Sequence, residues 1–194
     1  EDVSPATTNL YTLTCTGDRG DIERNGTITV LPPDDGGGSD GTARVVISEV
    51  MYDLDDTQGS ESANEWVELY NAGDASADLS DWKIGDAGSD GGSFPEGTVL
   101  AAGAYLLIAE STTTENFWTI PSDTVIASLP SLNNGGDALY LRDASDATID
   151  AMSYGSNIDV FDPSVTDVVA GHSLERCPAG VDTDSLADWI DQEN

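Results

Sequence analysis

The sequence has 194 residues, of which 38% are hydrophobic, so it is long enough to bury the core of one large domain. The 37 acidic residues outnumber the 6 basic ones and give a formal net charge of −31. Nucleic acids and anionic lipids bind through Lys and Arg, so this charge argues against both as partners. No apolar run reaches the length of about 18 residues that crosses a bilayer, so we expect no membrane insertion.

The acidity comes mainly from aspartate, with 26 Asp against 11 Glu. Aspartate favours turns, helix caps and sites for hard cations, whereas glutamate suits helices. Three explanations therefore stay open: solvated loops, adaptation to high salt, and binding of divalent cations. Repulsion among so many carboxylates lowers stability unless salt or bound cations screen it.

Two β-like runs open the chain, at residues 10–16 and 26–31, and residues 17–25 between them are typical of a hairpin loop. An Arg19-Gly20-Asp21 tripeptide lies in that loop, where chance alone accounts for it. Asn25 begins an Asn-Gly-Thr sequon and is a candidate glycosylation site, although Asn-Gly is itself typical of a tight turn. The residues of these runs that we take as assembly strands are Leu10, Tyr11, Leu13, Ile28 and Val30.

Residues 32–42 contain two prolines and several glycines and aspartates, which is the composition of a linker. Beyond it, turn-rich segments separate short runs with the alternation of β-strands. We expect strands at residues 43–52, 64–71, 80–86, 97–110, 123–128, 137–143 and 147–155, and short helices only near 111–118 and 182–190. The pairs expected to face the core are Val45 and Ile47, Val67 and Leu69, Trp82 and Ile84, Leu106 and Ile108, and Leu139 and Leu141.

Five stretches carry a resemblance: VVISEVMYD, NEWVELYNAGDASADLSDWKIGD, GTVLAAGAYLLIAE, NNGGDALYLRDASDATIDAMSYG and HSLERCPAGVDTD. In this order they resemble the lamin-tail domain, in the form found in secreted bacterial and archaeal proteins, over roughly residues 43–184. The resemblance implies an immunoglobulin-like β-sandwich that serves as a non-catalytic module of extracellular proteins. Nuclear members contact DNA and chromatin, which the charge of −31 opposes here.

The first 30 residues resemble the last strands of a bacterial immunoglobulin-like repeat. The expected fold class is thus all-β: a lamin-tail sandwich with an N-terminal β-hairpin segment. The expected division is a hairpin or partial immunoglobulin-like segment at 1–31, a linker at 32–42, and the sandwich with a C-terminal extension at 43–194.

No motif of a hydrolase, a P-loop or a dinucleotide-binding enzyme occurs, and we expect no catalytic residues. His172 is the only histidine, so a Cys/His zinc site lacks ligands, and we expect a structural role for it. The acidic segment DLDDTQGSESANE predicts a Ca²⁺ site, because Ca²⁺ takes six to eight oxygen ligands. Its candidate ligands are Asp53, Asp55, Asp56, Glu61 and Glu65, and a weaker second loop holds Asp86 and Asp90.

We expect a secreted, non-catalytic structural or assembly module, such as a calcium-stabilised subunit of an extracellular filament or surface layer joined by strand exchange. Its partners would be copies of itself or other extracellular proteins. The alternative is a targeting or binding module of a larger extracellular enzyme, and an intact metal-dependent enzyme ranks third. Whether Cys15 and Cys177 pair with each other stays open at this stage.

Overall fold

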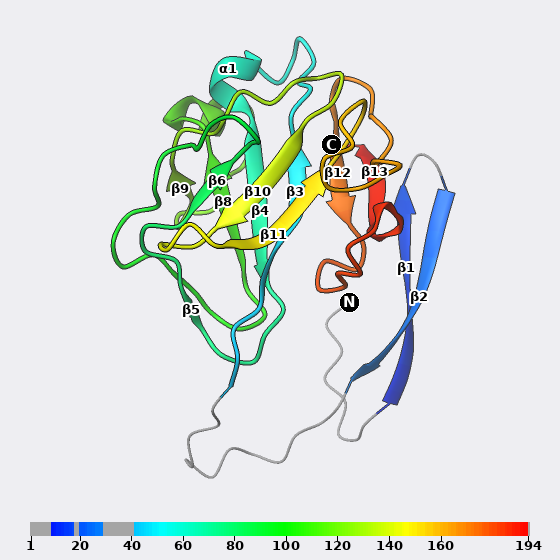
Figure 1. Cartoon of the computed structure of the whole chain (residues 1–194). Helices are drawn as coiled ribbons and strands as arrows, with labels where there is room; N and C mark the ends of the chain where they lie inside the picture. The colour runs from blue at the N-terminus through cyan, green and yellow to red at the C-terminus, as the bar shows by residue number, and fades with distance from the viewer. Residues whose placement is uncertain (1–8, 18–19, 29–40, 194) are drawn as a thin grey trace.

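The computed structural model describes residues 9–17, 20–28 and 41–193, with the backbone alone for the first two ranges and for Ser62. The main body is a sandwich of two β-sheets (Figure 1). The large sheet contains, from edge to edge, β13 (Trp189–Glu193), β12 (His172–Arg176), β3 (Val45–Met51), β4 (Trp66–Asn71), β8 (Tyr105–Ala109) and β9 (Val125–Ile126). The small sheet contains β11 (Thr148–Ser153), β10 (Ala138–Arg142) and β6 (Lys83–Gly85).

Short elements connect these strands. Two-residue strands β5 (Ala77–Asp78) and β7 (Val99–Leu100) pair with each other. One α-helical turn, α1 (Glu61–Asn64), lies between β3 and β4. Two 3-10 turns, η1 (Thr112–Asn116) and η2 (Leu186–Asp188), lie in the segments expected to form helices. None of the described helices is long or apolar enough to cross a membrane.

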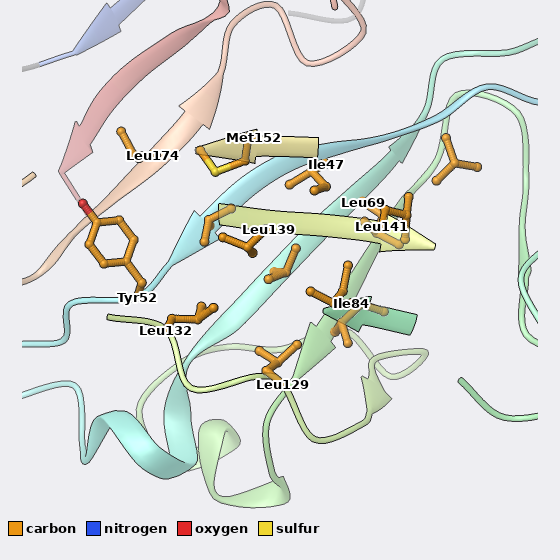
Figure 2. Close-up of a cluster of buried hydrophobic side chains, with 14 of the residues drawn as sticks. Ile47, Tyr52, Leu69, Ile84, Leu129, Leu132, Leu139, Leu141, Met152 and Leu174 are labelled. Atoms are coloured by element: carbon orange, nitrogen blue, oxygen red, sulfur yellow. The ribbon is translucent and has the colours of Figure 1, made fainter. Parts of the chain in front are cut away.

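The core lies between the two sheets, where alternate residues of each strand meet. Figure 2 shows Leu139 and Leu141 of β10 over Ile47 of β3 and Leu69 of β4. All ten residues predicted to face inward contribute: nine are buried in this core, and Trp82 packs against it half-buried. The prediction of an all-β, two-layer sandwich is therefore confirmed.

A β-bulge in β3 changes which residues face the core. The register with β4 shifts between Ile47 and Glu49, so Ile47 and Val50 both lie in the core although they are three residues apart. Glu49 is placed on the opposite, outer face of the large sheet, paired with Glu68 of β4.

Three expectations about strand boundaries were wrong. β2 (Gly20–Ile28) begins within the expected loop, so Asn25 pairs with Thr12 of β1 (Asn9–Gly17) instead of lying in a turn. Pairing with β1 outweighs the low strand propensity of its polar residues. Residues 97–110 form two strands, because a turn in which the Ala104 N–H donates to the Ala101 carbonyl separates β7 from β8. Neither β12 nor β13 was expected.

The β1–β2 hairpin forms a sheet of its own, and β1 lies against β13 at the edge of the large sheet (Figure 1). Of the expected assembly residues, Leu10, Tyr11 and Leu13 belong to β1 and Ile28 ends β2. Val30, like most of the expected linker, lies outside the described residues.

Candidate functional site

The predicted calcium loop connects β3 to β4 and contains α1 (Figure 1). The Asp55 carboxylate stabilises the turn of the loop, because its Oδ1 accepts hydrogen bonds from the backbone N–H and the hydroxyl of Thr57, both at 2.7 Å. These bonds lower the pKa of Asp55. Gln58 closes the turn by donating through its backbone to the Asp55 carbonyl at 3.1 Å. Asp56, next along the loop, is exposed.

Asp53 and Glu61 are brought together by an amide from a distant loop. Asn134, in the turn before β10, donates through Nδ2 to Asp53 Oδ1 at 2.8 Å and to Glu61 Oε1 at 2.6 Å. Burial raises the pKa of Asp53, and the charges of Glu61 and Asp167 raise it further. Sequence reasoning missed Asn134, since its NNGG segment is typical of a turn and nothing in it points to a loop more than 70 residues earlier.

Glu65 lines a hollow of about 240 Å³ together with Glu61 and Glu110, whereas Asp53 does not line it. Glu65 is only 5% exposed. Burial raises the pKa of Glu65 to about 8, and the charges of Glu110, Glu61 and Asp137 add to this shift, while the Leu132 N–H opposes it. The hollow therefore contains three carboxylates whose mutual repulsion the protein tolerates.

The five predicted calcium ligands are thus divided among the loop turn, the Asn134 bridge and the Glu65 hollow. Within the part of the chain that the structure describes, no three carboxylate, imidazole or thiol groups are arranged to hold a metal ion. The calcium site stays a prediction.

The second predicted metal loop is an ion-pair cluster. Asp90 lies 3.1 Å from Lys83 Nζ and is also paired with Arg142, and the hydrogen bond from Lys83 lowers the pKa of Asp90. Asp86 accepts the backbone N–H of Gly88 at 2.6 Å. Both carboxylates already have partners within the protein, so the calcium proposal below does not include this loop.

Arg176 on β12 is the most buried charged residue of the range 41–193, with 0% exposure. Its guanidinium donates to Asp150 Oδ2 at 2.9 Å, to Asp182 Oδ1 at 2.6 Å and to the Ile47 carbonyl at 2.8 Å. Burial raises the pKa of Asp150 to about 6, against the opposing charge of Arg176. This arrangement ties β12 to β3 of its own sheet and to β11 of the small sheet. The sequence signal for it was an Arg within the HSLERCP segment, for which no strand was expected.

His172, at the start of β12, has its Nδ1 2.8 Å from Asp191 Oδ1 on β13. This contact joins the edge strand β13 to its neighbour β12, and the structural role expected for His172 stays a prediction. Cys177 directly follows β12 and is disulfide-bonded. The chain contains one other cysteine, Cys15, whose side chain lies outside the described residues.

Comparison with protein-family models gives a match to the lamin tail domain over residues 39–156, more than half of the chain. The chain belongs to the lamin tail domain family. The match starts after the β1–β2 hairpin, so the resemblance of the first 30 residues to an immunoglobulin-like repeat stays a prediction. No curated protein and no solved structure gave a significant match. The family is an immunoglobulin-like structural domain, which agrees with a non-catalytic module.

Proposed function

We propose that this chain is an extracellular structural module that assembles by docking its β1–β2 hairpin on the β13 edge of a neighbouring copy. The observation that carries the proposal is the position of β1 against β13. A contact made within one chain can be made between two chains when the connecting segment lets the element exchange. The proline- and glycine-rich composition of residues 32–42 suits such an exchange.

The disulfide at Cys177 supports an extracellular location, since disulfides persist in oxidising compartments. We propose Cys15 as its partner, because it is the only other cysteine in the chain and belongs to β1, the strand next to β13. A disulfide between these two cysteines would lie within one chain if the hairpin stays on its own domain, and between two chains if the hairpin docks on a neighbouring copy.

Calcium would strengthen such a module by relieving repulsion around Glu61, Glu65 and Glu110. The support for this part is the raised pKa of Glu65, which reflects burial beside uncompensated negative charge. Calcium prefers carboxylate and carbonyl oxygens, and the Glu65 hollow is also lined by the loop of residues 129–132.

The test is to oxidise the purified chain over a range of concentrations with calcium present and to separate it by non-reducing electrophoresis and light scattering. Exchange predicts a ladder of disulfide-linked multimers that reductant collapses, and Cys15→Ser is the matched control that forms no ladder. A single monomeric band at every concentration, with Cys15 and Cys177 joined within one chain by peptide mapping, would contradict assembly.

That second outcome would favour the alternative function, a targeting or binding module of a larger extracellular enzyme whose hairpin stays on its own domain. The observation in its favour is that β1 contacts β13 of the same chain in this structure.

A further inference from the structure

Three glutamates stand side by side on the outer face of the large sheet. Glu49 of β3 is paired with Glu175 of β12 on one side and with Glu68 of β4 on the other. We call these three residues the glutamate row. Like charges directly opposite each other on neighbouring strands are unfavourable, so the row lowers the stability of the sheet that carries it.

No described cation offsets this charge. Lys83 and Arg142 pair with Asp90, Arg176 is enclosed between the sheets, and Arg44 donates to the Gly180 carbonyl. These four are the basic residues of the range 41–193, so within it the row has no ionic partner.

The glutamates find only hydroxyl partners among the described residues. Ser173 donates to Glu49 and Ser48 donates to Glu68. Burial raises the pKa of Glu49 to about 7, and the charges of Glu68 and Glu175 add to the shift although the Ser173 bond opposes it.

An aromatic groove of about 260 Å³ begins at Glu68 and continues over β8. Tyr105, which is 51% exposed, and Leu107 of β8 line it, together with Trp66 of β4 and Trp118 of the segment after η1. The two indoles meet edge to face at 5.7 Å. Trp66 is 7% exposed, and neither indole N–H has a hydrogen-bond partner among the described residues.

We propose that this surface, the aromatic groove with the glutamate row at its end, docks a basic peptide segment of another protein. A Lys or Arg side chain lays its apolar stem on aromatic rings and its charge beside their faces or a carboxylate. The peptide cation supplies the positive charge that is missing beside the glutamate row.

Charge complementarity selects this occupant over a neutral one. A neutral oligosaccharide could stack on Tyr105 or Trp118, but it would leave the repulsion along the row unchanged. A charge-assisted bond to a partly buried carboxylate is about twice as strong as a neutral one, so the row favours a cation.

The test is an NMR titration of the oxidised full chain with a lysine decapeptide at about 150 mM salt, where screening weakens contacts with isolated surface charges. We expect the indole N–H signals of Trp66 and Trp118 to shift while those of Trp82 and Trp189 stay in place. Replacing the row by Glu49→Gln, Glu68→Gln and Glu175→Gln should weaken binding about tenfold. Thermal unfolding checks that this variant folds, and Tyr105→Ala, at an exposed position, is a second variant expected to weaken binding.

The matched control removes three exposed carboxylates that do not line the groove, through Glu96→Gln, Asp159→Asn and Asp162→Asn. It has the same net charge as the triple Gln variant and should bind like the unchanged protein. Equal loss in both triple variants would mean non-specific attraction to a polyanion and would overturn the proposal. Indole shifts with cellohexaose and none with the lysine peptide would assign the groove to a glycan instead.

Discussion

Two groups of carboxylates in this molecule have opposite electrostatic surroundings. Around Arg176, Asp150 and Asp182 surround a guanidinium that is fully enclosed between the sheets. In the glutamate row, Glu49, Glu68 and Glu175 face one another without a cation among the described residues. The first group uses charge to hold strands together, whereas the second keeps charge on the surface at a cost in stability. The presence of a cation beside the carboxylates therefore distinguishes a structural cluster from a surface available to a partner.

The largest effect is expected from breaking the compensated group. Asp188 Oδ2 lies 3.9 Å from Arg176 Nη1, so Arg176→Ala leaves both Asp150 and Asp188 buried without their cation. We expect it to lower the free energy of unfolding by about 3–5 kcal/mol. Urea unfolding at neutral pH measures this loss. Arg44→Ala, which removes an exposed guanidinium, is the control and should change stability little. A loss in Arg176→Ala no larger than in the control would show that the cluster does not hold the sheets together.

Relieving the uncompensated group should have the opposite sign. The pKa of Glu49 rises from 4.5 to about 7 on folding, so its unfavourable contribution is absent below about pH 4.5, grows with pH, and is complete above about pH 7. Glu49→Gln should therefore raise the free energy of unfolding by about 1–3 kcal/mol near pH 8 and leave it unchanged near pH 4. Unfolding curves of both proteins across this pH range provide the measurement. A difference that does not vary with pH would show that ionisation of Glu49 is not its cause.

The Glu65 hollow is a second uncompensated group, and calcium should act on it. Millimolar Ca²⁺ should stabilise the folded state by about 1 kcal/mol, which raises the melting temperature by a few degrees, because it binds the folded chain alone. Glu65→Gln should raise the melting temperature without calcium and remove most of the calcium response. NaCl at the same ionic strength is the control, and an equal rise with NaCl would mean screening and no site.

The smallest effect should come from the exposed ion pairs of Asp90. Asp90→Asn removes the bonds from Lys83 and Arg142, which are near the surface and screened by solvent. We expect a small decrease in melting temperature that disappears at about 1 M salt. A large, salt-independent decrease would place this cluster with Arg176 among the structural ones.

Much of the sandwich could be predicted because strand alternation is a local signal. Val45 with Ile47 and Leu139 with Leu141 face the core as their spacing indicates. β12 was missed because its alternation includes His172 and Arg176, polar residues that become internal only through partners on other strands. β2 was misjudged because its polar residues are strand-forming only when β1 lies beside them.

The sequence shows that carboxylates are concentrated between β3 and β4. It does not show that the fold places them in three different surroundings. Asp55 bonds to its own turn, and Glu65 is buried between α1 and β4 because the α1 turn directs the chain into the sheet. The bridge by Asn134 depends on the folded sandwich and has no local signal. The glutamate row likewise depends on the bulge at Glu49 and on the register with Glu175.

The strand order also determines how this domain responds to mechanical tension. β3 and β13 run parallel, because each is antiparallel to β12 between them. Force applied at residues 41 and 193 therefore pulls the start of β3 and the end of β13 from opposite ends of the sheet. The ladder hydrogen bonds lie across the strands, so this pull shears all of them together instead of opening them one after another. Such a geometry resists extension of the domain between residues 41 and 193.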